Sequence, residues 1–178
     1  MSAPTVADIM VSVHDGLRDA GIDHAFGGAL ALAWCTQQAR GTIDVDVNVF
    51  VPPSRADEVL AALPNEITPT ADERGVLRRD GQVRLWWGAT PVDVFLNTAD
   101  FHERAAARVR WEPFSGRDLP FLACEDLAVF KAFFNRTRDW ADLEAMHEAG
   151  TLDVQAVVGV VATLLGGDDE RVARLRSL

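Results

Sequence analysis

The chain has 178 residues, of which 48% are hydrophobic, and a formal net charge of −10. That length can bury a real core, so we expect one domain, or one domain with a helical extension. The negative charge disfavours a broad nucleic-acid surface, because such surfaces are usually basic. No stretch approaches membrane-spanning length, and the N-terminus lacks a basic region followed by an apolar core. We therefore expect no membrane partner and a cytoplasmic location.

The first hundred residues predict helices that alternate with strands. Apolar residues at helical spacing, followed by Gly21 where a helix can end, predict the first helix. Pro52 and Pro53 end a strand and lead into a helix. The expected elements are, in chain order, a helix over 4–20, a strand over 22–26, a helix over 29–37, a strand over 43–51, a helix over 54–63, and paired strands over 84–87 and 92–96.

Beyond Asp100 the pattern is mostly helical. The expected elements are a helix over 101–108, a short hairpin over 109–122, helices over 125–135, 139–148 and 154–165, and a last polar turn over 170–178. The sequence contains no low-complexity linker and no internal repeat. We place a soft boundary near Phe121, between a part with the sheet over 1–121 and a helical part over 122–178.

Two acids lie on the strand expected over 43–51. Side chains on a strand alternate between faces, so Asp44, Asp46 and Asn48 point one way and the intervening apolar residues point the other way. At about 6 Å and an effective dielectric constant of about 20, the two acids repel each other by roughly 3 kcal/mol, which a cation would relieve. Mg²⁺ suits this pair because it prefers a few carboxylates together with substrate phosphates. The alternative is a half-exposed strand whose polar residues face water.

Two further features bear on that choice. Gly27 and Gly28 form a strand-to-helix turn, where exposed backbone N–H groups and missing Cβ atoms would let a phosphate approach. Asp93 is a single carboxylate in an otherwise apolar strand and is costly to bury without a partner or a metal. The alternatives are an ordinary tight turn and an Asp bonded to a loop. Together the features predict a phosphate and metal site.

These residues carry a family resemblance. Its first part is the ordered set Gly27-Gly28, then Arg40-x-Thr42-x-Asp44-x-Asp46, then Asp93. Its second part runs from Glu125-Asp126-Leu127 to Lys131 and then to Arg136-x-x-Asp139-x-x-Asp142. The order resembles the DNA polymerase β-like nucleotidyltransferase superfamily. The likeness is closer to its small bacterial branches, including the abortive-infection (AbiEii-type) toxin nucleotidyltransferases, and spans about residues 22–144.

The resemblance implies an α+β fold, in which a palm-like mixed sheet is flanked by helices and followed by a C-terminal helical part. Residues 1–121 would then be the catalytic domain and 122–178 a helical cap. It also implies two Mg²⁺ ions, a bound nucleoside triphosphate, and transfer of a nucleotidyl group to a hydroxyl or phosphate on a small molecule, a tRNA end or a protein. Asp44, Asp46 and Asp93 match the metal-binding and catalytic acids.

The resemblance assigns nucleotide contacts as well. Gly27 and Gly28 match the triphosphate turn, although many members carry Ser where this chain has Gly28. Thr42 belongs to the same motif and is assigned to nucleotide binding. Arg40 and Lys131 are candidate cations for the leaving pyrophosphate. The alternatives are a solvated loop arginine and a surface lysine on an amphipathic helix.

The cysteines and histidines add no site. Cys35 and Cys124 lie far apart without Cys-x-x-Cys spacing, so we expect neither a zinc site nor a disulfide, but two buried thiols. The histidines show no metal-ligand pairing, and we expect surface or boundary positions for them. Their positions are His14, His24, His102 and His147.

Three functions stay open at this point. The first is an active nucleotidyltransferase. The second is a toxin or antitoxin-system member that shares the chemistry and needs a cognate antitoxin-type protein. The third is a nucleotide-binding module that has lost catalysis, which is consistent with Gly28. The sequence does not identify the acceptor, because acceptor pockets depend on loops and cap helices that no motif encodes.

Overall fold

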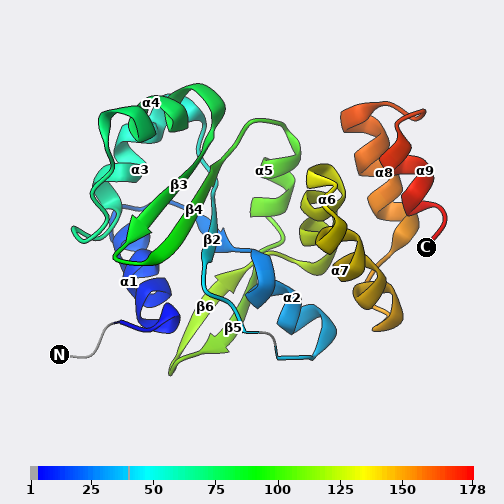
Figure 1. The fold of residues 1–178 in the computed structure, drawn as a ribbon, viewed down its shortest axis with the longest axis horizontal. Coiled ribbons are helices and arrows are strands. Elements are labelled where there is room, and N and C mark those ends of the chain that lie inside the picture. Colours follow the sequence, from blue (N-terminus) through cyan, green and yellow to red (C-terminus); the bar gives the residue numbers. More distant parts are fainter. Residues whose placement is uncertain (1–3, 40) are drawn as a thin grey trace. The chain divides into compact units, whose positions relative to one another are not determined.

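The structure, a computed structural model, describes residues 4–39 and 41–178 and contains a six-stranded mixed sheet with the order β3-β4-β2-β1-β6-β5 (Figure 1). The strands are β1 (His24–Phe26), β2 (Val45–Val49), β3 (Gln82–Trp87), β4 (Thr90–Leu96), β5 (Arg110–Phe114) and β6 (Arg117–Phe121). Strand β2 runs parallel to β4 and antiparallel to β1, and β1 runs parallel to β6. The hairpins β3–β4 and β5–β6 are antiparallel. The expected α+β class is confirmed.

Helices make up most of the remaining described chain. They are α1 (Val6–Asp19), α2 (Gly28–Thr36), α3 (Ala56–Ala62), α4 (Ala71–Asp80), α5 (Phe101–Ala106), α6 (Cys124–Phe134), α7 (Thr137–Glu148), α8 (Val154–Leu165) and α9 (Glu170–Leu175), and a 3₁₀ turn, η1, covers Pro53–Arg55. Among the described residues, no helix combines the length and the apolar character needed to cross a membrane. Only α4 has no counterpart among the expected elements.

Helix α4 was missed because it lacks an apolar stripe. Leu77 is its only fully buried residue, so the periodicity that reveals most helices is absent. The signal that could have found it is a capping box. The Thr70 side chain accepts from the Glu73 N–H, and the Glu73 carboxylate accepts from the Thr70 N–H. Gly81 then ends the helix in the left-handed conformation, with φ of 69°.

The described chain folds into two compact units. The first unit contains residues 4–27 and 41–121, and therefore the whole sheet with α1, α3, α4 and α5. The second unit contains residues 28–39 and 122–178, and therefore α2 with α6 to α9. Helix α2 thus belongs by its packing with the C-terminal helices, although it follows β1 in the chain. The catalytic and cap roles expected for 1–121 and 122–178 stay predictions.

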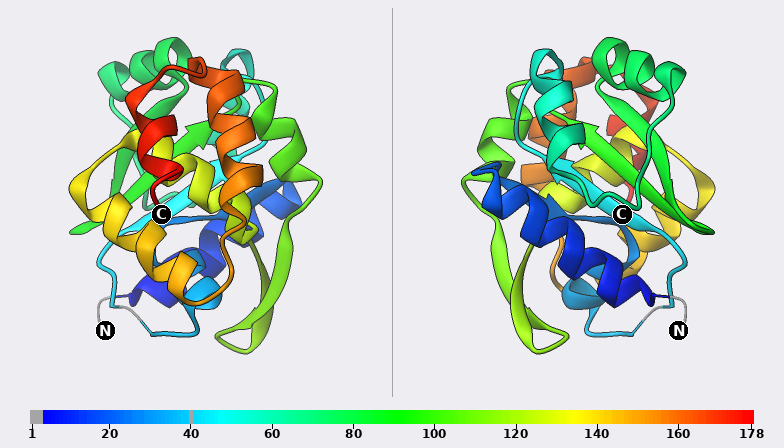
Figure 2. Two further views of the ribbon diagram at one scale, coloured as in Figure 1. Left: turned by 90° about the vertical axis from the view of Figure 1, so that its right-hand side faces the viewer. Right: turned by 90° about the vertical axis from the view of Figure 1, so that its left-hand side faces the viewer.

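In the first unit one face of the sheet forms an apolar core. Alternate residues of β2, β3 and β4 are buried on that face, and Val45, Val47, Leu85, Val92 and Val94 are all at most 1% exposed. Helices α1, α3 and α4 form a chain of contacts with one another and with β2 and β3. The right-hand view of Figure 2 looks onto these three helices. The apolar face therefore fixes which residues of the same strands lie on the other face.

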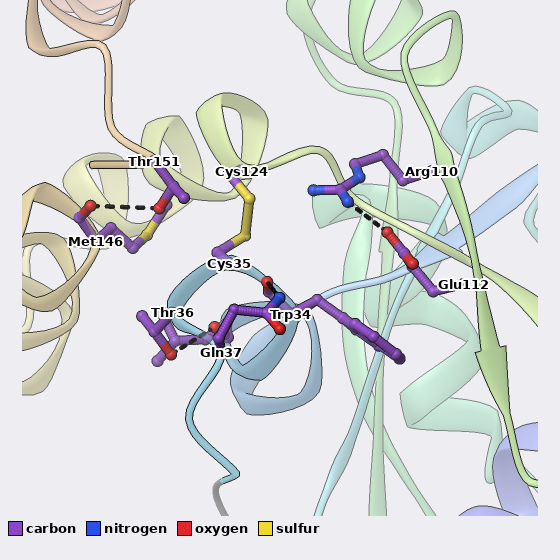
Figure 3. The surroundings of a disulfide bond; sticks show 10 residues. Trp34, Cys35, Thr36, Gln37, Arg110, Glu112, Cys124, Met146 and Thr151 are labelled. Atoms are coloured by element: carbon purple, nitrogen blue, oxygen red, sulfur yellow. Dashed lines mark hydrogen bonds and ion pairs between the residues drawn. A yellow bond between two sulfur atoms is a disulfide. The ribbon is translucent and has the colours of Figure 1, made fainter. Parts of the chain in front are cut away.

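In the second unit a disulfide joins α2 to α6. Cys35 and Cys124 are bonded, with Cα atoms 5.6 Å apart (Figure 3). The expectation of two unpaired thiols is therefore wrong. Their separation of 89 residues hid the pairing, because α2 leaves its sequence neighbours and packs with residues beyond 121. The spacing of cysteines in a sequence does not reveal such long-range packing.

We predict that replacing both cysteines, as in Cys35→Ala/Cys124→Ala, lowers the free energy of unfolding by several kcal/mol. Closing a loop of this length constrains the unfolded chain by about 4 to 5 kcal/mol in the chain-entropy model. Urea unfolding with and without dithiothreitol measures the effect. The reductant should lower the midpoint of the wild type and leave that of the double variant unchanged. Equal midpoints for reduced and oxidised wild type would contradict the prediction.

Three histidines are buried, which corrects the expectation of surface or boundary positions. His14, His24 and His102 are at most 8% exposed. His24 Nδ1 lies 2.9 Å from the Ile22 carbonyl oxygen, to which it donates, so its Nε2 accepts from His14 Nδ1 at 2.9 Å. Burial lowers the pKa of His24 to about 4. Both rings line a hollow of about 380 Å³ in the first unit.

We predict that the protein loses stability as pH falls from 6.5 toward 4. The folded-state pKa of His24 lies below its unfolded value of 6.5, so the unfolded chain binds more protons in this window, and stability is complete only above pH 6.5. For His24 the loss approaches about 1.4 kcal/mol per pH unit. Urea unfolding at pH 7, 6 and 5 measures it. The slope should shrink in His24→Gln and persist in His147→Gln. An unchanged slope in His24→Gln would overturn the assignment.

Candidate functional site

The sheet register sets Asp46 and Asp93 side by side. In the parallel pair of β2 and β4, Asp46 lies directly opposite Asp93, and in the β3–β4 hairpin Arg84 lies opposite Asp93. These three residues form one row across adjacent strands. Because the valines on either side of Asp46 belong to the apolar core, the row lies on the opposite face of the sheet. The alternation in the sequence correctly predicted that Asp46 points away from the apolar residues of β2.

Asp44 precedes β2 and is oriented by Thr42. The Thr42 hydroxyl donates to Asp44 Oδ1 at 2.6 Å, and the Asp44 N–H donates back to Thr42 Oγ1 at 3.3 Å. Such local bonds compete with strand pairing. They explain why β2 begins at Val45 rather than at the expected residue 43. Thr42 is therefore placed beside one of the three acids, and its predicted contact with nucleotide stays a prediction.

The guanidinium of Arg84 joins the acids. It makes two hydrogen bonds to Asp93, Nε to Oδ1 at 2.8 Å and Nη2 to Oδ2 at 2.6 Å, and Nη2 lies 3.9 Å from Asp44 Oδ2. These bonds raise the pKa of Arg84 above its usual range, and the charges of Asp44 and Asp46 raise it further. All three acids thus act on one cation. Arg84 was not among the predicted site residues, because the predicted hairpin did not fix which residue lies opposite Asp93.

The donor set suits a hard divalent metal. Carboxylate oxygens are the ligands that Mg²⁺ prefers. Asn48 lies two residues after Asp46 on β2 and on the same face of the sheet. It is 4% exposed, and its Oδ1 has no hydrogen-bond partner among the described residues. Such an orphaned oxygen is typical of a site that takes a water or an ion. As arranged, however, no group of three or more His, Cys, Asp or Glu side chains in the described chain is close enough to hold a metal ion.

The glycine pair lies at the start of α2. The Gly27 N–H donates to the Asp46 carbonyl oxygen at 2.9 Å, which ties the end of β1 to the acid-bearing strand. Gly28 is the first residue of α2 and has a φ of 58°, which only glycine adopts readily. The turn geometry matches the sequence prediction, and phosphate binding there stays a prediction. Arg40, the other predicted contact from this region, lies outside the described residues.

Lys131 lies within the second unit and is buried rather than solvated. Its Nζ lies 2.7 Å from Asp142 Oδ2 and 3.8 Å from Asp139 Oδ1. Asp139 also accepts from Arg136 at 2.7 Å. The helical motif noted in the sequence thus forms an ion-pair network between α6 and α7. A triphosphate contact by Lys131 stays a prediction, and it would require Lys131 to share its charge with these aspartates.

We predict that Lys131→Ala destabilises the protein. The change leaves the buried Asp142 carboxylate without its cation, and breaking a buried ion pair from one side costs about 3 to 5 kcal/mol. Urea unfolding measures the loss. A Lys131→Met/Asp142→Leu variant removes both charges and should recover part of it. If Lys131→Ala keeps wild-type stability and only weakens nucleotide binding, the prediction of a structural role is wrong, and the result supports a contact between Lys131 and the nucleotide.

Comparison with known proteins places the fold. No protein-family model and no curated protein matches the chain. The solution structure of the antibiotic-resistance factor ANT(2'')-Ia matches 96% of this chain and 95% of its own, with a TM-score of 0.62 and 14% identity. The crystal structure of ANT(2'')-Ia with adenylyl-2''-tobramycin matches 98% of this chain and 96% of its own, with a TM-score of 0.55 and 15% identity.

A nucleotidyltransferase-like protein from Paracoccidioides brasiliensis is also similar, with a TM-score of 0.49 and 15% identity over 98% of this chain and 95% of its own. The chain therefore has the fold of the two ANT(2'')-Ia structures. The finer likeness to abortive-infection toxins stays a prediction. So does a cognate antitoxin-type partner.

Proposed function

We propose that the chain is a nucleotidyltransferase that moves a nucleotidyl group from a nucleoside triphosphate to a hydroxyl acceptor. The observation that carries the proposal is the pair of Asp46 and Asp93 on adjacent parallel strands. Asp44 lies close to Arg84, the cation that binds Asp93. The fold of the ANT(2'')-Ia structures supports it. A fold alone does not define an activity, so the acids carry the argument.

In this proposal the acids hold the metal and one of them handles the proton. Asp44, Asp46 and Asp93 would bind Mg²⁺, which when bound neutralises charge on the transferring phosphoryl group. Asp93 is the candidate to accept the proton of the attacking hydroxyl at a carboxylate oxygen, because it matches the third acid of the family motif that the sequence resembles. Thr42 keeps the Asp44 carboxylate oriented through its hydroxyl. Gly27 and Gly28 would receive the triphosphate at their backbone.

The acceptor class that we favour is a small polyhydroxylated molecule. ANT(2'')-Ia was solved with adenylyl-2''-tobramycin, an adenylylated small molecule, and the two chains cover each other almost completely. This chain also has a net charge of −10, which disfavours an RNA end as acceptor because RNA-binding surfaces are usually basic. Phosphate acceptors and protein hydroxyls are the alternatives that the experiment includes.

The direct test is transfer from triphosphates labelled at the α-phosphate. The four nucleoside triphosphates are supplied with Mg²⁺ and, in separate reactions, with aminoglycosides, simple sugars, tRNA and protein. Label that moves onto an acceptor supports the proposal and identifies the acceptor class. Binding of triphosphate without transfer to any acceptor would favour the alternative of a nucleotide-binding module that has lost catalysis.

We predict that Asp46→Asn abolishes Mg²⁺-dependent transfer and keeps the fold. The substitution removes one metal ligand, and it also relieves repulsion among the acids, so stability without metal should hold or rise. Transfer assays and urea unfolding measure the two effects. Asp57→Asn, which removes an exposed partner of Arg78 in the same unit, is the matched control and should keep activity. A large loss of stability in Asp46→Asn would show that Asp46 is a structural residue.

A further inference from the structure

Arg84 occupies the oxygens that a metal would need. Its two N–H groups contact both carboxylate oxygens of Asp93, at 2.8 and 2.6 Å. A divalent metal coordinates carboxylate oxygens directly, at about 2 Å for Mg²⁺. One carboxylate cannot satisfy a bidentate guanidinium and a metal in this way without rearranging. The arginine also explains how the acids lie together although they repel one another.

The arginine can move while its strand stays in place. Val83 and Leu85, its neighbours on β3, are at most 9% exposed on the apolar face and anchor the strand. The Arg84 side chain is 51% exposed, whereas that of Asp93 is 15% exposed. Rotation about its side-chain bonds can therefore carry the guanidinium off Asp93 without disturbing the core.

A displaced guanidinium needs another anion. A triphosphate bound next to Asp93 would offer oxygens within reach, and a guanidinium binds phosphate bidentately as well as it binds carboxylate. A metal ion that arrives alone offers no such exchange and meets a like charge. A triphosphate therefore gives the displaced guanidinium of Arg84 a new anionic partner, and a metal ion alone does not.

We propose that Arg84 is a positioning residue that competes with the divalent metal for Asp93 and is released to the triphosphate, so that metal binds well only together with nucleotide. This inference rests on the proposed function. It predicts a dependence that a purely structural ion pair would not show. Removing Arg84 should strengthen the binding of metal alone and weaken the binding of metal with triphosphate.

The test compares Arg84→Gln, Arg84→Lys and Arg78→Gln with the wild type. Arg78 makes the same bidentate contact to Asp57, at 3.2 and 2.6 Å, within the same unit and away from the row of acids, so it is the matched control. Mn²⁺ binding without nucleotide is followed by electron paramagnetic resonance. Binding of a non-hydrolysable ATP analogue with saturating Mg²⁺ is followed by calorimetry. Thermal unfolding confirms that each variant is folded.

We expect Arg84→Gln to bind Mn²⁺ alone at least tenfold more tightly and the ATP analogue with Mg²⁺ at least tenfold more weakly. Arg84→Lys keeps the charge but loses the bidentate contact, so it should lie between Arg84→Gln and the wild type in both measurements. Arg78→Gln should match the wild type. These opposite changes in one variant are the signature of competition followed by release.

Two results would overturn the inference. The first is Mn²⁺ binding in Arg84→Gln that equals or falls below that of the wild type. The second is tighter Mn²⁺ binding with unchanged affinity for the ATP analogue, because release to the triphosphate would then be absent. Failure of the proposed function looks different. In that case no protein, including the wild type, would bind the ATP analogue, whatever happens to Mn²⁺.

Discussion

The parallel register between β2 and β4 is the constraint on which the candidate site depends. It sets Asp46 opposite Asp93, while the valines on both sides of each acid fix the strands in the core. A slip of β2 by one residue would turn Asp46 into that core and its flanking valines out of it. The apolar face therefore holds the two carboxylates together although they repel one another. Arg84 then offsets that repulsion from the next strand.

Much of this arrangement could be predicted because it follows from local pattern. Alternation placed Asp46 on the polar face of its strand, and the helices with apolar stripes appeared near their expected positions. The sequence did not show what depends on distant packing or on the register of a hairpin. Cys35 meets Cys124 only because α2 packs with helices far along the chain, and Arg84 meets Asp93 only through the hairpin register. Burial of His24 is likewise set by the sheet rather than by its neighbours in sequence.

The helices of the second unit bury an ion-pair network. Lys131, Asp139 and Asp142 are each less than 10% exposed, and Lys131 pairs with both carboxylates. Buried ion pairs seldom add net stability over apolar packing, but removing one member is costly. The same unit holds the disulfide, and disulfides are rare in a reducing cytosol. The predicted cytoplasmic location stays a prediction, and the bond gives a reason to measure the redox state of the protein in cells.

The division of the chain also has a consequence for its synthesis. Helix α2 is made early, but the partners that bury Ala31, Leu32 and Cys35 lie beyond residue 121. Until the residues beyond 121 leave the ribosome, the apolar residues of α2 lack their packing partners. Exposed apolar segments of this kind favour aggregation and attract chaperones. The residues of the first unit are all synthesised once Phe121 is added, before the helices that complete the second unit.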